Sequence, residues 1–106
     1  MEVTDMAQRE DARKIKALAD ENRLKIMLSL QSGEKCACVL GEELNISQST
    51  LSHHMRLLCD SNLVNGRKDG KWMYYSISPD GTERFMEMLS EYLKCTDKSD
   101  KNSCCK

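Results

Sequence analysis

Apolar residues recur at helical spacing over most of the chain. Residues 7–19 predict a first helix, and residues 20–33 predict a second that begins at the N-cap Asp20 and stops at Gly33. A third, short helix is expected from about Cys36 to Leu44. The apolar faces of the first two helices are expected to comprise Ala12, Ile15, Leu18 and Ala19 in the first, and Leu24, Met27, Leu28 and Leu30 in the second.

The middle of the chain carries the pattern of a helix-turn-helix. In the stretch "NIS", Asn45 tolerates a left-handed turn and Ser47 is a favourable N-cap. A fourth helix is expected over about residues 48–60, because its apolar residues recur at i, i+4 and i+7. A short helix, a tight turn and a helix with a polar outer face together predict a helix-turn-helix. The residues of the fourth helix expected to face the core are Leu51, Met55 and Leu58.

The stretch "LVNGRKDGKWMYYSIS" changes from helical spacing to alternation. Asp69-Gly70 joins two strand-like runs and is a strong hairpin signal, because both central positions of a type I′ turn require positive φ. A basic-tipped hairpin directly after a helix-turn-helix is a wing. Pro79 then fits the first turn of a last helix, where its missing N–H costs little. The apolar stripe of that helix is Phe85, Met88, Leu89, Tyr92 and Leu93.

Together these patterns predict a mainly helical winged helix-turn-helix with a small β-hairpin wing, in the order α-α-α-α-β-β-α. Residues 1–94 are expected to form this single domain. Residues 95–106 are expected to form a flexible polar tail that holds Cys95, Cys104 and Cys105. The chain starts without an apolar signal segment and has no run long enough to span a bilayer, which favours a cytoplasmic protein with no membrane partner.

The distribution of charge is more informative than the net charge of −1. Between Ser47 and Tyr75 four basic residues stand against two acidic ones, which is compatible with a phosphate-facing surface. Adjacent helical positions diverge by about 100°, so His53 and His54 are not expected to share a metal ion. His53 is expected to meet DNA and His54 to be partly packed. The predicted DNA-binding residues are Ser47, Gln48, Ser49, Thr50, Ser52, His53, Arg56, Arg67, Lys68 and Lys71.

Six cysteines in 106 residues could form a disulfide framework. Without an export signal, and with two pairs too closely spaced for loop-closing bridges, metal binding or thiol reactivity is favoured instead. Inside a regular helix Cys36 and Cys38 would point about 200° apart. They can chelate one ion only if Cys36 lies at or before the first turn, where free N–H groups also lower the thiol pKa. Closing both sulfurs on an ion is then expected to bend that turn. The alternative is that both are small buried apolar residues.

The element order and several stretches resemble the ArsR/SmtB family of small winged-helix repressors. "KALADENRLKIMLSL" and "GRKDGKWMYYSI" carry the resemblance, and "SQSTLSHHMRLL" is similar to the family's recognition helix. "EKCACVL" is similar to the thiol segment Glu-Leu-Cys-Val-Cys-Asp-Leu-Cys of the arsenite-sensing members. Val39 and Gly41 stand where that pattern has Asp and a third Cys. The resemblance implies a homodimer, paired through its first and last helices, that binds a palindromic operator in double-stranded DNA until a ligand releases it.

The chemistry of the thiols narrows the choice of ligand. Thiolates select soft ions, so As(III) or Sb(III) is the expected inducer, with Cd(II) or Pb(II) as an alternative. A repressor of the same fold that responds to thiol oxidation or to sulfide also stays open. Cys36 and Cys38 are the expected first ligands, and Cys59 is expected to be a core or boundary residue. The candidates for a further thiolate ligand are Cys95, Cys104 and Cys105.

Other classes of function are disfavoured. A thiol oxidoreductase or arsenate reductase using Cys104 and Cys105 would need features that the sequence lacks, such as Cys-x-x-Cys, a phosphate-binding loop or a βαβ pattern. A zinc site on the last helix is disfavoured because residues 80–94 contain no His. The expectation is therefore a repressor that is not an enzyme, has no organic substrate and requires no cofactor for DNA binding.

Overall fold

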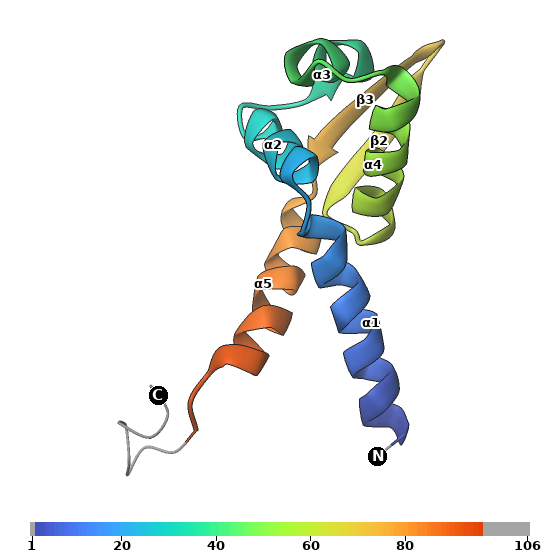
Figure 1. Ribbon diagram of the computed structural model, residues 1–106. Coiled ribbons are helices and arrows are strands. Elements are labelled where there is room, and N and C mark those ends of the chain that lie inside the picture. Colours follow the sequence, from blue (N-terminus) through green and yellow to red (C-terminus); the bar gives the residue numbers. More distant parts are fainter. Residues whose placement is uncertain (1, 97–106) are drawn as a thin grey trace.

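The structure is a computed structural model that describes residues 2–96 (Figure 1). In chain order its elements are α1 (Glu2–Leu18), α2 (Glu21–Leu30), β1 (Lys35–Cys36), α3 (Ala37–Leu44), α4 (Gln48–Asp60), β2 (Val64–Asp69), β3 (Trp72–Ile77) and α5 (Pro79–Leu93). This is a mainly helical winged helix-turn-helix, as the sequence predicts. Two elements differ from the prediction, because α1 begins earlier and a short strand, β1, precedes α3. Within the described residues, no helix is both long and apolar enough to cross a membrane.

Local capping explains where α2 begins. The Asp20 carboxylate accepts the backbone N–H groups of Asn22 at 2.9 Å and Arg23 at 3.1 Å, which satisfies two donors of the first turn. The helix ends at Leu30, before the predicted stop at Gly33, whose φ of 130° lies in the following loop. Both the predicted cap and the approximate helix end are therefore correct.

The buried face of α2 differs from the predicted one. Ile26 and Leu30 are buried, whereas Leu24 and Leu28 are 49% and 64% exposed. The helix carries apolar residues on more than one side, so its sequence alone does not determine which side is buried. The side of Ile26 and Leu30 is buried because it faces the other helices and the sheet. The prediction that Leu24 and Leu28 belong to the core face is wrong.

The hydrophobic core lies where α2, α3 and α4 meet the sheet and the start of α5. In α4, Leu51, Met55 and Leu58 are almost completely buried, which confirms the predicted inner face. Cys59 is partly buried against this core, and its burial raises the pKa of the thiol. The residues of the buried cluster are Ile26, Leu30, Leu40, Leu51, Met55, Leu58, Leu63, Val64, Tyr75 and Phe85.

The sheet has three antiparallel strands in the order β1-β3-β2. β2 and β3 form the predicted hairpin, with Val64 opposite Ile77 and Asp69 opposite Trp72. Asp69 is thus the last residue of β2, and the two turn residues are Gly70 and Lys71. Of these two, only Gly70 has positive φ, at 64°, as in a type II′ turn. The predicted type I′ turn centred on Asp69-Gly70 is therefore shifted by one residue.

α5 begins as predicted and approaches the body very closely. Pro79 is its first residue, and the Ser78 hydroxyl accepts the N–H of Gly81 at 3.0 Å. A Cβ on Gly81 would lie only 1.6 Å from the backbone oxygen of Asn62, so no larger residue fits without a backbone shift. From this contact α5 extends away from the winged-helix body, and α1 extends from the same end (Figure 1).

The two extended helices give the subunit an elongated shape. Its extents are 57 × 29 × 22 Å and its radius of gyration is 17.0 Å. A compact domain of roughly 100 residues would have a radius of gyration of about 13 Å. Several large apolar side chains on these helices are exposed, namely Met6 on α1 and Met86, Tyr92 and Leu93 on α5.

Candidate nucleic-acid interface and thiol site

α3, a tight turn and α4 form the helix-turn-helix. Asn45 ends α3 in the left-handed conformation, with φ of 58° and ψ of 48°, as its side chain allows. The Ser47 hydroxyl then caps α4 by accepting the N–H of Thr50 at 3.2 Å. Both local predictions are confirmed. Only Asn45, Ile46 and Ser47 separate the two helices.

The outer face of α4 is polar and exposed. Ser49, Ser52, His53 and Arg56 all point away from the core and are accessible to a partner. At the helix start, the Ser47 hydroxyl lies 3.2 Å from that of Ser49 and 2.9 Å from that of Thr50. This cluster of hydroxyls at a helix N-terminus can donate to phosphate oxygens or base edges.

His54, in contrast, belongs to the interior. It is 8% exposed, and its Nδ1 lies 2.9 Å from a guanidinium nitrogen of Arg23. The same guanidinium donates from Nε to the Ala17 carbonyl, which ties α1, α2 and α4 together. Burial lowers the pKa of His54, the Asp20 carboxylate opposes this shift, and Arg23 adds to it. A neutral His54 accepts from Arg23, which gives this residue a structural role.

The wing presents basic residues, but one of them is already paired. Arg67 donates from Nε and from a terminal nitrogen to the Glu34 carboxylate, both at 2.8 Å, and its guanidinium lies 4.6 Å from the Tyr74 ring centroid. Lys68 and Lys71 are exposed near the hairpin tip, and the Lys71 ammonium lies 5.5 Å from the Trp72 ring centroid. The wing therefore offers two accessible ammonium groups beside a guanidinium held by Glu34.

Cys36 and Cys38 lie at the start of α3 with their Sγ atoms 3.0 Å apart. Cys36 is the N-cap, with extended backbone at φ −71° and ψ 147°, so it stands outside the helix. The geometric condition for chelation by an i, i+2 pair is thus met. The expectation that the first turn must bend to gather the sulfurs is wrong, because the two sulfurs are already adjacent. We call Cys36 and Cys38 the thiol pair.

The electrostatics of the thiol pair favour one thiolate. The hydrogen bond from Cys38, together with nearby backbone N–H groups, lowers the pKa of Cys36. The same shared hydrogen bond raises the pKa of Cys38. Cys36 therefore loses its proton more readily than Cys38, and both thiols must be deprotonated to act as ligands.

The other cysteines are not brought to the thiol pair within the described residues. Cys59 lies on α4, against the core. Cys95 follows the end of α5 and is disulfide-bonded, so it is not a thiolate in this structure. Cys104 and Cys105 fall outside the described residues, as does most of the predicted tail 95–106. Across residues 2–96, no group of three or more His, Cys, Asp or Glu side chains is arranged to hold a metal ion.

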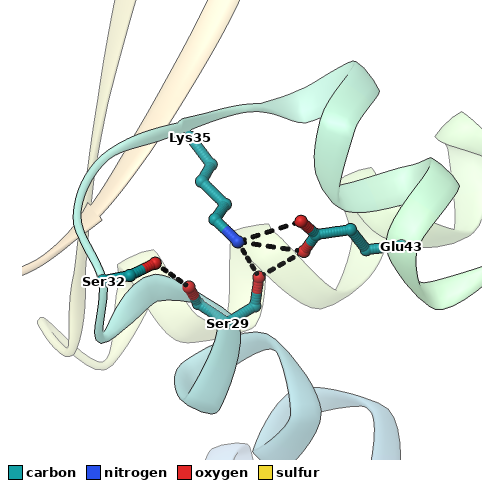
Figure 2. A network of polar contacts seen from close by, with 4 residues as sticks. All are labelled: Ser29, Ser32, Lys35 and Glu43. Atoms are coloured by element: carbon teal, nitrogen blue, oxygen red, sulfur yellow. Dashed lines mark hydrogen bonds and ion pairs between the residues drawn. The ribbon is translucent and has the colours of Figure 1, made fainter.

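The segment before the thiol pair is held by a polar network (Figure 2). The Lys35 ammonium donates to the Glu43 carboxylate at 2.9 Å and to the Ser29 hydroxyl at 2.8 Å. Ser29 also donates to Glu43, and the Ser32 hydroxyl donates to the Ser29 carbonyl (Figure 2). Lys35 thus joins α2 to α3 immediately before the first thiol.

The thiol pair also lies beside the DNA-facing elements. Lys35 and Cys36 form β1 and pair with Tyr75 and Tyr74 of β3. A groove of about 390 Å³ runs between the thiols, the start of α4 and the wing. Its lining residues are Cys36, Ala37, Cys38, Gln48, Ser52, Lys71, Trp72, Met73 and Tyr75. The thiols therefore line the same groove as residues of the recognition helix and of the wing.

Sequence reasoning missed the residues that hold this segment. Lys35 and Glu43 are eight residues apart, and Glu34 and Arg67 are 33 apart, so neither ion pair follows helical i, i+3 or i, i+4 spacing. Their opposite charges are visible in the sequence. Only the addition of β1 to the edge of the wing sheet brings Glu34 to Arg67.

The helix-turn-helix, the wing and the polar outer face of α4 define a winged helix-turn-helix DNA-binding protein. Residues 20–66 match the family described as "Bacterial regulatory protein, arsR family". An arsenical resistance operon repressor of Bacillus subtilis (strain 168) is 42% identical over 94 residues, which cover 87% of this chain and 87% of that protein. The chain belongs to the arsR family of bacterial regulatory proteins. It is a transcriptional repressor and not an enzyme.

Solved structures agree with this assignment. A crystal structure of a possible transcriptional regulator for arsenical resistance superimposes with a TM-score of 0.70 and 28% identity, covering 77% of this chain and 85% of that one. The homodimeric winged helix-turn-helix DNA-binding domain of a possible ArsR-family regulator from Mycobacterium bovis superimposes with a TM-score of 0.69 and 26% identity. That similarity covers 84% of this chain and 82% of the other.

Proposed function

We propose that the chain represses transcription as a homodimer on a palindromic operator and is released when its thiol pair binds a thiophilic ion, As(III) or Sb(III). The observation that carries the proposal is the 3.0 Å separation of the Cys36 and Cys38 sulfurs at the start of α3. Two thiolates so close form a ready chelate, and soft sulfur ligands select thiophilic ions over hard ones. The relative from Bacillus subtilis, an arsenical resistance operon repressor, supports the choice of arsenic.

The proposed site needs a third thiolate, because As(III) and Sb(III) favour three sulfur ligands. We assign this role to Cys104, Cys105 or, once its disulfide is reduced, Cys95, in the same subunit or in the partner. Cys59 is a poor candidate, since it lies against the core and this burial raises its pKa, which disfavours the thiolate. Bringing a distant thiolate to the thiol pair would move the start of α3.

The proposed DNA contacts come from α4 and the wing. Seven of the proposed contacts lie at the start and on the outer face of α4, namely Ser47, Gln48, Ser49, Thr50, Ser52, His53 and Arg56. The other three, Arg67, Lys68 and Lys71, lie on the wing. All ten are exposed, as DNA contact requires. In a dimer, two such helices would read half-sites about one helical turn apart.

The proposed dimer is paired through α1 and α5. These helices extend from the body (Figure 1). They expose large apolar side chains such as Met6, Met86 and Leu93. Burial of such side chains against a second copy would stabilise the pair. The homodimeric state of the domain from Mycobacterium bovis supports a homodimer.

The experiment is an anaerobic titration of the dimer–operator complex with arsenite, cadmium and a thiol oxidant in parallel. Wild type is expected to lose operator affinity with arsenite. A hundredfold loss requires a preference of only about 2.7 kcal/mol for the released form. Cys36→Ser and Cys38→Ser should still bind the operator and ignore arsenite, whereas the matched control Cys59→Ser should respond as wild type does. If cadmium or the oxidant released the operator and arsenite did not, that agent would be the inducer instead of arsenite. Failure of Cys36→Ser to bind DNA at all would make the pair structural.

A further inference from the structure

One hydrogen bond joins the thiol pair directly to the recognition helix. The side-chain amide of Gln48, the first residue of α4, donates to the backbone carbonyl of Ala37 at 3.3 Å. Ala37 is the residue between Cys36 and Cys38, and it is the first residue of α3. The contact therefore links the peptide that separates the two thiols to the start of α4, independently of the turn at residues 45–47.

Gly41 gives this amide its room. A Cβ built at Gly41 would lie 2.4 Å from Nε2 of Gln48 and 3.4 Å from the Ile46 carbonyl oxygen. The first distance is far below van der Waals contact, so any larger residue at position 41 would push the amide away. The second is ordinary contact, so the backbone tolerates the addition. Gly41 thus controls whether Gln48 can reach Ala37.

Ligand binding at the thiol pair would strain this contact. An ion with bonds of about 2.3 Å to two thiolates at angles between roughly 90° and 110° would hold the sulfurs about 3.3–3.8 Å apart. In the structure they are 3.0 Å apart, so coordination spreads them by several tenths of an ångström. The hydrogen bond to Ala37, at 3.3 Å, is already longer than usual and would not survive a similar displacement.

We infer that Gln48 is a positioning residue that couples occupancy of the thiol pair to the start of the recognition helix, and that Gly41 permits this coupling. The inference rests on the proposed function. The hydrogen bond exists in the operator-competent form and is lost in the released form, so it favours the competent form. Removing it makes the released form more accessible, and the inducer then binds more tightly.

The test is Gly41→Ala, which displaces the Gln48 amide from the Ala37 carbonyl without changing a thiol. Because the contact is a single exposed hydrogen bond, half-release of the operator complex should need about two- to fivefold less arsenite, equivalent to about 0.4–1 kcal/mol. Because Gln48 is also a proposed DNA contact, operator affinity without arsenite is measured for each variant, and the arsenite effect is taken relative to that value. Circular dichroism and size-exclusion chromatography confirm the fold and the assembly of each variant.

A double-mutant cycle separates the coupling from the general gain in helix stability that alanine brings. Gln48→Ala should by itself lower the arsenite concentration for half-release, and adding Gly41→Ala should then change nothing further. An equal effect of Gly41→Ala in both backgrounds, or no effect in either, overturns the coupling. If the wild-type complex ignores arsenite, the proposed function fails and this coupling fails with it. If wild type responds to arsenite and the variants need the same arsenite concentration for half-release, the coupling is refuted and the proposed function stands.

Discussion

Removal of the Glu34 carboxylate is expected to strengthen operator binding by releasing Arg67. Two nitrogens of the Arg67 guanidinium donate to this carboxylate at 2.8 Å, and these bonds lower the pKa of Glu34. Glu34 is therefore a carboxylate that remains charged beside the wing. To contact a phosphate, Arg67 must either leave this partner or bring a negative charge close to the DNA backbone. Glu34→Gln removes both obstacles and keeps the size of the side chain.

The size of the effect follows from the exposure of the pair. The two side chains are 54% and 36% exposed, so solvent screens their attraction and the pair contributes at most about 1 kcal/mol. Glu34→Gln should therefore tighten operator binding by up to about fivefold. If Arg67 then makes a full phosphate contact, the slope of log affinity against log salt should become steeper by about 0.9.

Fluorescence anisotropy with a promoter duplex, between about 50 and 200 mM salt, measures both quantities. Lys68→Gln and Lys71→Gln should each flatten the slope by about 0.9, which calibrates the response of the wing. Glu91→Gln is the matched control, because it also removes one carboxylate from a surface ion pair, with Lys94 at 3.0 Å near the end of α5. Weaker binding by Glu34→Gln, with an unchanged slope, would show that Arg67 holds β1 to the wing and does not meet DNA.

Two further predictions concern stability. Gly81→Ala should lower the free energy of unfolding by about 3 kcal/mol, because its Cβ would collide with the Asn62 carbonyl. Urea unfolding measures this, with Gly41→Ala as the control, because the Cβ of that variant meets only a flexible amide. Equal stability of the two variants would contradict the prediction. Burial lowers the pKa of His54 from 6.5 in the folded state, so the unfolded chain binds its proton first and stability should fall as pH drops below about 6.5, levelling off below the folded pKa. Unfolding of wild type and His54→Gln across this range isolates the effect, and identical pH profiles would refute it.

The elements that could be predicted from sequence are those determined by local chemistry. Asp20 and Ser47 cap their helices through their own side chains, and Asn45 adopts the left-handed conformation that its type tolerates. Pro79 is the first residue of α5, because within a helix only the first turn accommodates a residue without an N–H. In each case the decisive interaction lies within a few residues, so the order of elements and the winged helix-turn-helix followed from the sequence.

The errors arose where distant residues decide the outcome. Leu24 and Leu28 have the same spacing as a core stripe, yet the elements packed on α2 select the side of Ile26 instead. β1 has two residues and no periodicity of its own, and it is a strand only because β3 pairs with it. The proximity of Cys36 and Cys38 depends on this strand, because the extended backbone at Cys36 turns its sulfur toward the sulfur of Cys38.

The position of the thiol pair explains how a small ligand could act on a DNA complex. Its segment is held by Glu34 to the wing, by Lys35 to α2 and α3, and by the Ala37 carbonyl to the recognition helix. Each contact is an exposed hydrogen bond or a screened ion pair, contributing on the order of 1 kcal/mol or less. Only all three contacts together, each at its upper limit, approach the roughly 2.7 kcal/mol that a hundredfold change in affinity requires. Bonds to two or three thiolates can therefore outweigh all of them, while in the absence of ligand the same contacts keep the wing and α4 in one arrangement.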